Sequence, residues 1–424
     1  MMRGFSIDSV TDPESNPFDR QERIPHWRQD KISKARIMIV GAGAIGNETL
    51  KNLALLGFSR MFIADFDHIS TSNLSRTVLF RKSDVERKKA EVAAERVREL
   101  CLVEDARIDW FHGDVVWELG TGLYRDMDLV LGCLDNIEAR LAINRQCWLA
   151  NTPWIDAGMY ELGIHVTSFV PPTGPCYECS LTDDRLKLAR ERYSCDNFKR
   201  KMFLEGKVPT VQVASAIASG IQVQEAVKLL CGQRVAQGHT IYYQGAINDF
   251  DVNRMPCKPD CLAHNSYDPV SPLPLSTDVT LEEFLSVVSR PEYAGEGSVL
   301  DFRGFRDFVV SLGCSVCGRT IEFLRPSFRI YDSETVCNVC RRPGSFKIDS
   351  TAADAPTQKL SLSEFGLAET SGRILGNTLR ELGVPYWPVL AVRDKAGGYH
   401  YYELSGDRES IIPNMARSDG GRFA

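Results

Sequence analysis

The sequence lacks long apolar runs, and it carries no excess of positive charge. No stretch in its 424 residues approaches the ~18–20 consecutive apolar residues of a membrane-spanning helix. The N-terminal segment MMRGFSIDSVTDPESNPF is polar and lacks the apolar core of a signal peptide. The formal net charge is −6, whereas proteins that bind nucleic acid usually carry a basic excess. We therefore expect a soluble, cytoplasmic protein with no membrane or nucleic-acid partner.

Strands and helices alternate along the chain from residue 35 onward. The segments RIMIV, RMFIADFD and MDLVLGCLDN are typical of buried strands, and helical segments separate them. This pattern predicts an α/β fold with a Rossmann-like, doubly wound sheet that is mostly parallel and covered on both faces. We expect four parts: an N-terminal arm at 1–34, this domain at 35–265, a proline-rich hinge at 266–278, and a smaller α+β domain at 279–424.

A glycine-rich segment, GAGAIG, follows the first strand and opens a helix. It contributes Gly41, Gly43 and Gly46, and Asp65 lies 19 residues after Gly46 at the end of the next strand. Glycines let the backbone approach phosphates at a helix N-terminus, and an acid at this distance is placed to bind ribose hydroxyls. On these residues alone, a dinucleotide-dependent oxidoreductase or an unrelated Rossmann protein is the better interpretation.

The polar segment that follows changes this balance. For any single residue of this segment, DFDHISTSNLSR, a position in a solvated loop is the plainer interpretation. As a group, however, the charged and polar residues here favour a functional site: Asp65, Asp67, Asn73, Arg76, Lys89 and Asp135. Asp135 stands at the carboxyl end of a buried strand, where open α/β sheets bind ligands. Two cations for a polyphosphate and a carboxylate for Mg²⁺ suit ATP chemistry better than hydride transfer.

Four motifs resemble one superfamily in order and spacing. GAGAIG, DFDHISTSNLSR, LDNIEAR and CYEC are similar to the adenylation domain of the ThiF/MoeB and ubiquitin-activating enzymes, over about residues 18–262. The resemblance implies that Asp65 binds the ribose and that Asn73, Arg76 and Lys89 contact the phosphates, although Lys88 is only one position away. It assigns Asp135 to Mg²⁺ and the phosphates, within a motif completed by Asn136 and Arg140.

The N-terminal segment FDRQER resembles the family segment whose arginine reaches the ATP of a partner protomer. This resemblance assigns Arg20 to that role, with Arg23 as the alternative, and it implies a homodimer. The implied reaction is ATP-dependent adenylation of the C-terminal glycine of a ubiquitin-like β-grasp protein. A sulfur-carrier adenylyltransferase, an inactive scaffold and an NAD oxidoreductase remain the alternatives. A bacterial conjugation pathway of the kind found in antiphage operons is one setting for such an enzyme.

The chain has thirteen cysteines, and eight of them form close pairs. Cysteine pairs in a cytosolic protein predict metal sites more readily than disulfides. The predicted zinc ligands are Cys176, Cys179, Cys257 and Cys261 for one site and Cys314, Cys317, Cys337 and Cys340 for the other. The second set has a zinc-ribbon spacing, whereas the first departs from it because Cys257 and Cys261 are separated by three residues. Both sites are expected to be closed and structural.

Cys195 differs from the remaining single cysteines. Its flank, RLKLARERYSCDNFKRK, carries seven Lys and Arg residues, and nearby cations favour the thiolate. A surface cysteine in a basic loop is the plainer interpretation. The resemblance favours a catalytic cysteine in the segment 180–208, to which the acyl group would pass as a thioester. The C-terminal domain would then be a ubiquitin-like fold, interrupted by the zinc ribbon, that recruits a conjugating enzyme.

Overall fold

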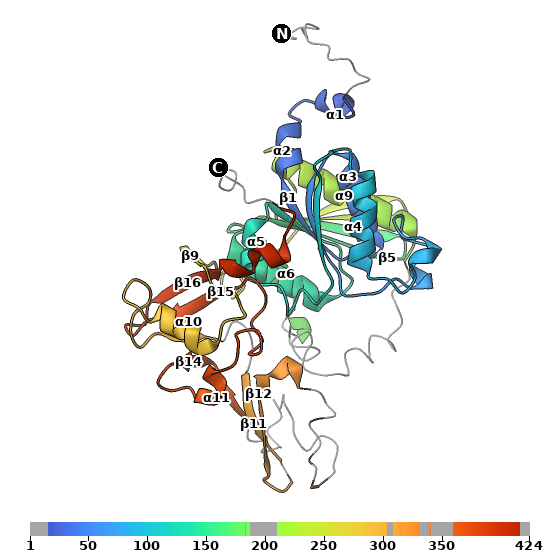
Figure 1. Cartoon of the computed structure of the whole chain (residues 1–424). Coiled ribbons are helices and arrows are strands. Elements are labelled where there is room, and N and C mark those ends of the chain that lie inside the picture. The colour runs from blue at the N-terminus through green and yellow to red at the C-terminus, as the bar shows by residue number, and fades with distance from the viewer. Residues whose placement is uncertain are drawn as a thin grey trace.

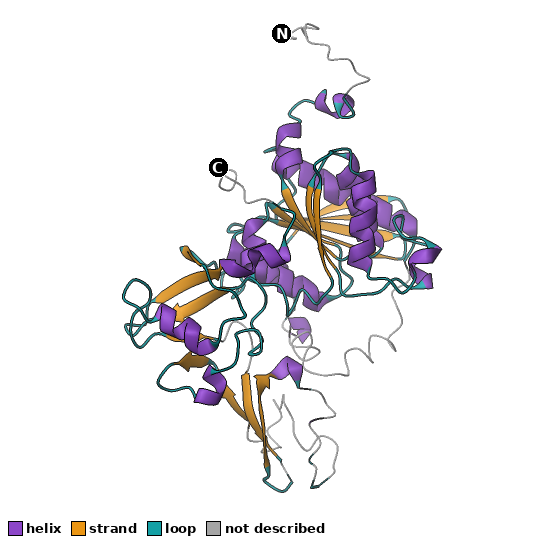
Figure 2. Cartoon of the chain, in the orientation of Figure 1, coloured by secondary structure: helices purple, strands orange, loops and turns teal. Residues whose placement is uncertain are grey.

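The computed structural model describes residues 16–182, 184–186, 210–302, 308–314, 316–330, 334, 337, 339–340 and 359–415. Strands in this part of the chain form three sheets, of eight, five and three strands. The large sheet with its helices and the two smaller sheets occupy different ends of the molecule (Figures 1 and 2). None of the described helices combines the length and the apolar character needed to cross a lipid bilayer.

The large sheet has the strand order β3-β2-β1-β4-β5-β6-β7-β8. Its strands are β1 (Arg36–Val40), β2 (Arg60–Ala64), β3 (Arg107–Phe111), β4 (Leu129–Gly132), β5 (Trp154–Tyr160), β6 (Gly163–Phe169), β7 (His239–Gln244) and β8 (Asp249–Arg254). The first five run parallel, and β6 to β8 continue the sheet in antiparallel pairs. In the sheet, β1 has β2 on one side and β4 on the other, so the direction in which strands are added reverses at β1. A ligand-binding crevice is therefore expected between the carboxyl ends of β1 and β4. The predicted fold class is therefore confirmed.

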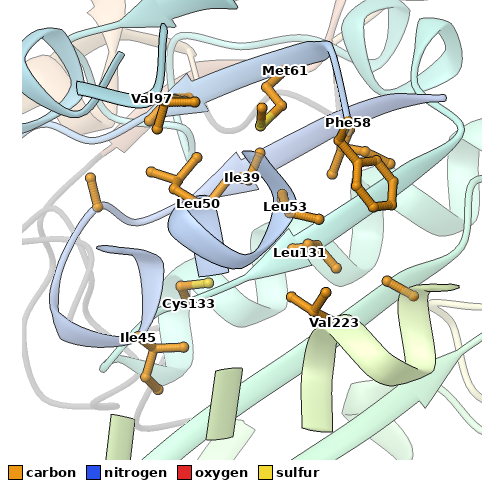
Figure 3. Close-up of a cluster of buried hydrophobic side chains, with 14 of the residues drawn as sticks. Ile39, Ile45, Leu50, Leu53, Phe58, Met61, Val97, Leu131, Cys133 and Val223 are labelled. Atoms are coloured by element: carbon orange, nitrogen blue, oxygen red, sulfur yellow. The ribbon is translucent and has the colours of Figure 1, made fainter. Parts of the chain in front are cut away.

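Helices cover both faces of this sheet. They are α3 (Ala44–Leu55), α4 (Lys89–Leu100) and α9 (Gln212–Leu230) on one face, and α5 (Thr121–Asp126) and α6 (Ile137–Ala150) on the other. Alternate residues of β1 face opposite ways, so Ile39 joins the first core cluster and Met38 the second. Figure 3 shows Leu50 and Leu53 of α3 and Val223 of α9 gathered around Ile39. Each such buried side chain stabilises the fold by about 1.5–3 kcal/mol.

The described part of the N-terminal arm contains the short helices α1 (Asp19–Glu22) and α2 (Gln29–Lys34). The side-chain amides of Gln21 and Gln29 both donate to the carbonyl of Leu56, at 3.0 Å each. Gly57 has a φ of +87°, and a Cβ there would lie 2.7 Å from the ring of Phe18. The arm is thus held at the C-terminal end of α3, next to the edge of the sheet where β1 begins (Figure 1).

The C-terminal part contains a five-stranded sheet with the order β14-β10-β15-β16-β9 and a three-stranded sheet with the order β12-β11-β13. The strands are β9 (Val270–Leu273), β10 (Val299–Asp301), β11 (Phe308–Gly313), β12 (Thr320–Pro326), β13 (Lys359–Leu362), β14 (Glu364–Gly366), β15 (Val389–Arg393) and β16 (Tyr399–Leu404). The helices are α10 (Leu281–Val288), α11 (Gly372–Leu375) and α12 (Arg408–Ile411). The segment predicted as a hinge contains β9, which pairs in parallel with β16. Whether this part acts as a ubiquitin-like recruiting domain stays a prediction.

The two parts of the chain meet on the face of the large sheet that carries α5 and α6. The carboxylate of Asp126 in α5 forms ion pairs with the guanidinium groups of Arg36 in β1, at 2.8 Å, and of Arg408 in α12, at 3.2 Å. Ile411 and Ile412 join the core cluster on this face. Short 3-10 turns complete the described elements: η1 (Thr71–Asn73), η2 (Lys82–Asp84), η3 (Tyr177–Ser180), η4 (Ser327–Arg329) and η6 (Ser405–Asp407). Residues of the last described segment, Ile411, Ile412 and Met415, are therefore part of the packing of the large sheet.

Candidate active site

The glycine-rich turn links the end of β1 to the start of α3. Gly41 has a φ of +96°, and a Cβ there would lie 2.5 Å from the carbonyl oxygen of Cys133. A Cβ at Gly46 would lie 1.9 Å from the carbonyl oxygen of Gly41, so the turn closes only with glycine at both positions. A Cβ at Gly43 would meet no protein atom within 4 Å. Gly43 therefore leaves the N-terminus of α3 accessible to an anionic group.

Asp65 is fixed against this turn. Its carboxylate accepts hydrogen bonds from the backbone N–H of Ala42 and of Asp67, both at 2.7 Å. Its own backbone N–H donates to the carbonyl of Phe111, at the end of β3, at 3.2 Å. Burial raises the pKa of Asp65 above its usual value, and the charge of Lys89 opposes part of that rise. The structure thus brings together the glycines and the acid that the sequence predicted as a nucleotide site.

Lys89 begins α4 and points towards the acids of the loop after β2. Its ammonium group lies 2.7 Å from a carboxylate oxygen of Asp67, and its side chain is only 10% exposed. Lys88 faces another way, with its ammonium group 5.7 Å from the centre of the Trp110 ring. Of the two lysines that the sequence left open, Lys89 is therefore the one in contact with the acidic loop.

Asn73 and Arg76 have different surroundings. The side-chain oxygen of Asn73 accepts from the backbone N–H of Ser70 at 2.9 Å, so this residue shapes the loop. The guanidinium of Arg76 donates to the carbonyl of Ser72 at 2.7 Å. Among the residues that the structure describes, no carboxylate forms an ion pair with Arg76. Its charge thus remains available for an anionic ligand.

Asp135 follows β4 at the carboxyl edge of the sheet and is exposed. The neighbouring Asn136 caps α6, because its side-chain oxygen accepts from the N–H of Ala139 at 2.8 Å. Arg140, which the sequence grouped with these two residues, is buried and donates to the carboxylate of Asp156 at 2.8 Å. It also donates to the carbonyl of Leu134, directly before Asp135. Arg140 thus holds the backbone that carries Asp135.

Sequence reasoning missed Asp156 and His165. Burial raises the pKa of Asp156, but the charge of Arg140 and the nearby imidazole of His165 outweigh it and hold that pKa below its usual value. The imidazole of His165 lies 3.6 Å from the carboxylate. An acid inside an apolar strand, with an arginine one helix earlier, could have signalled this pair. Asp156 lies opposite Gly132, the last residue of β4, and the pair thereby supports the backbone that leads to Asp135.

The arginines predicted to reach the ATP of a partner protomer lie away from the site of their own chain. Arg20 is exposed on α1, and Arg23 pairs with Asp19 at 2.7 Å. The arm packs on the far end of α3, and a helix of 12 residues is about 18 Å long. Arg20 is therefore held away from the glycine-rich turn of its own chain.

The first cysteine cluster differs from its prediction in one ligand. The donor atoms that lie within 4.8 Å of one another belong to Cys176, Cys179, Cys261 and His264. Cys257 is exposed and lies beside Cys179, outside this group of donor atoms, where the structure places His264 instead. The spacing Cys261-x-x-His264 was the overlooked signal, since two intervening residues place both ends of a knuckle on one metal.

His264 is held in place by its surroundings. Its ring stacks on that of Trp148, with 4.1 Å between centroids, and its Nε2 lies 3.4 Å from the sulfur of Cys179. Burial lowers the pKa of His264, which favours the neutral imidazole that binds metals. Three thiolates and one imidazole fit a tetrahedral Zn²⁺.

The second cluster brings together the four cysteines that the sequence grouped. Cys314, Cys317, Cys337 and Cys340 have their sulfurs within 4.8 Å of one another, beside strands β11 and β12. This donor set also fits Zn²⁺, and it leaves no position for a water ligand. Cys195, the predicted nucleophile, and most of the segment 180–208 lie outside the described residues.

Comparison with known proteins finds similarity over the part of the chain that contains these residues. The profile of the ThiF family matches residues 18–263. The chain is 38% identical over 160 residues to "SUMO-activating enzyme subunit uba-2" of Caenorhabditis elegans, covering 37% of this chain and 27% of that protein. It is 27% identical over 269 residues to "Sulfur carrier protein adenylyltransferase" of Thermus thermophilus, covering 59% of this chain and 92% of that protein.

Sequence identity to solved structures is lower. The structure of E. coli MccB with ATP aligns with a TM-score of 0.46 and 22% identity, over 56% of this chain and 68% of that chain. The chain spans about a quarter of the length of the SUMO-activating subunits that it matches.

Proposed function

Because the chain belongs to the ThiF family, we propose that it is an ATP-dependent adenylyltransferase acting on a ubiquitin-like or sulfur-carrier protein. The observation that carries this proposal is the arrangement at the carboxyl edge of the large sheet. There Asp65 is bound to the glycine-rich turn, Lys89 reaches Asp67, and Arg76 and Asp135 hold charges that no described ion pair uses. Cations beside a phosphate-binding turn suit a nucleoside triphosphate.

In the proposed reaction, a C-terminal carboxylate oxygen of the partner protein attacks the α-phosphorus of ATP. A phosphorus–oxygen bond forms, the bond to the bridging oxygen breaks, and pyrophosphate leaves. No side chain needs to remove a proton, since a carboxylate is already ionised at neutral pH. The protein aligns two anions and spreads the developing charge over Arg76 and Lys89. Mg²⁺ held by Asp135 would offset the charge of the phosphates.

The ribose is bound by Asp65 in this proposal. Both carboxylate oxygens of Asp65 already accept backbone N–H groups, so the side chain has one orientation. Each oxygen keeps a second lone pair for a ribose hydroxyl. The two cysteine clusters are proposed to hold structural Zn²⁺, one beside Trp148 of α6 and one in the C-terminal part.

A finer proposal concerns the step after adenylation. Cys195 would take the acyl group as a thioester and hand it to a conjugating enzyme; its basic flank supports this. The matched length of 92% of a sulfur-carrier adenylyltransferase favours a second candidate, in which the adenylate itself is the product. A homodimer would explain why Arg20 lies far from its own nucleotide site, because the arm could serve a partner protomer.

Intact mass measurement tests these alternatives. The protein is incubated with Mg²⁺, ATP and a β-grasp protein ending in glycine, with and without reductant. A thiol-labile adduct that is lost in both Cys195→Ala and Asp135→Ala would support activation followed by thioester transfer. Partner adenylate without an adduct would support the sulfur-carrier candidate. The exposed Asp105 provides a control, Asp105→Ala, which should behave as wild type.

A further inference from the structure

A loop of the C-terminal part is bonded to the connection between β3 and α5. The backbone N–H of Tyr386 donates to the carbonyl of Glu118 at 2.9 Å, and the N–H of Gly120 donates to the carbonyl of Tyr386 at 2.8 Å. A third bond joins the N–H of Gly122 to the carbonyl of Trp387 at 2.9 Å. A Cβ at Gly120 would lie 2.7 Å from that same carbonyl oxygen, so the close approach requires glycine.

Within the C-terminal part, Trp387 holds this loop in place. This side chain is 1% exposed, and its indole N–H donates to Glu403 at 2.9 Å. Its backbone N–H donates to the buried carboxylate of Asp407 at 2.8 Å. Figure 1 shows β15 and β16 next to α5 and α6, where this contact lies. The position of Tyr386 is therefore set by the C-terminal part.

The side chain of Tyr386 continues the contact towards the nucleotide site. Its ring lies edge to face with Phe111, with 6.2 Å between centroids. Phe111 ends β3, and its carbonyl accepts the backbone N–H of Asp65. Arg380 holds the tyrosine from the other side, 4.2 Å above the ring and 2.8 Å from the hydroxyl. A continuous series of contacts thus runs from Arg380 through Tyr386 and Phe111 to Asp65.

We propose that Tyr386 is a positioning residue for nucleotide binding, acting through Phe111 on the backbone of Asp65. This inference rests on the proposed function, because it assumes that Asp65 binds the ribose. Removal of the ring would let the end of β3 shift, and Asp65 would lose the fixed backbone that aligns it with the glycine-rich turn. The match to the ThiF family ends at residue 263, so this contribution comes from outside the matched region.

Direct titration of the full-length protein with ATP and Mg²⁺ tests the proposal. Tyr386→Ala and Tyr386→Leu are expected to weaken ATP binding by about threefold to tenfold, the range typical of coupling through packed side chains. Tyr386→Phe keeps the ring and should bind ATP within about twofold of wild type. Tyr293→Ala is the matched control, since that half-buried tyrosine packs on Tyr402 and not on Phe111.

Two further readouts separate positioning from a general loss of structure. The KM for ATP should rise in Tyr386→Leu while the KM for the β-grasp protein stays unchanged. Hydrogen exchange of the Asp65 amide should quicken, with no change at the amides of β1. If wild type binds ATP and Tyr386→Leu binds it equally well, the inference is wrong and the proposed function stands. If wild type itself binds no ATP, both fail.

Discussion

The two edges of the large sheet use charged residues in opposite ways. At the edge where β1 begins, Asp126 lies between Arg36 and Arg408, and the two arginine side chains are 6% and 10% exposed. At the carboxyl edge, Asp67 is half exposed, and neither Arg76 nor Asp135 takes part in an ion pair within the described residues. The first set is paired within the fold, whereas we propose that Arg76 and Asp135 of the second set meet a ligand.

This difference predicts which substitutions should unfold the protein and which should only inactivate it. Charges that are buried and paired are costly to leave without a partner. Charges that are exposed and held by their own backbone can be removed at little cost to stability.

The largest effect on stability is expected for Asp126→Ala. It leaves two buried arginines without their carboxylate, so the free energy of unfolding should fall by about 3–5 kcal/mol. Urea denaturation measures this. Asp278→Ala removes an exposed ion pair with Arg380 and should change stability by less than about 1 kcal/mol. Equal losses in the two variants would remove the distinction between the edges.

The largest effect on activity is expected for Asp135→Ala. Loss of a carboxylate that holds Mg²⁺ at the phosphates should slow adenylation by about 100-fold or more. The melting temperature should stay unchanged, because the side chain is exposed. Pyrophosphate exchange and thermal unfolding measure the two quantities. A large drop in melting temperature would mean that Asp135 belongs with the structural charges instead.

The same distinction separates His264 from Cys257. His264→Ala removes a ligand of the first cluster and should weaken zinc binding at least about tenfold, as measured by competition with a chelator. Cys257→Ser changes an exposed thiol outside the cluster and should leave zinc affinity as in wild type. The reverse pattern would restore the four-cysteine site that the sequence suggested.

The smallest effect concerns the pH dependence of stability. Burial raises the pKa of Asp109, and hydrogen bonds from Asn414 only partly offset this. The folded form therefore holds this proton to higher pH than the unfolded form. The stability linked to the protonated group is present below the unfolded pKa and is lost as pH rises through the folded pKa. Asp109→Asn should flatten the dependence of unfolding free energy on pH above about pH 4. A steeper dependence would contradict this.

Much of the arrangement of the proposed nucleotide site could be predicted because its residues lie at strand ends with fixed spacing. Gly41, Gly46 and Asp65 follow β1 and β2, and adjacent parallel strands bring their carboxyl ends together. Lys89 was predicted from the start of a helix, although only the structure separates it from Lys88.

Features that depend on contacts between distant segments could not be predicted. The pairing of Arg140 with Asp156 requires α6 to lie against β5, and spacing along the chain does not contain that information. The position of His264 beside Cys176, Cys179 and Cys261 likewise depends on how distant segments pack. The contact of Tyr386 with Phe111 joins residues 275 positions apart in sequence number, 386 minus 111, and no local pattern marks it.

ATP–pyrophosphate exchange is the most direct test of the central claim that the carboxyl edge of the large sheet activates a carboxylate with ATP. The assay would use the purified protein, Mg²⁺ and a β-grasp protein ending in glycine. We expect exchange that depends on the β-grasp protein, is abolished by Asp135→Ala and persists in Asp105→Ala. Tight ATP binding without exchange, for every β-grasp protein tried, would contradict the claim and indicate a domain that binds nucleotide without activating a carboxylate.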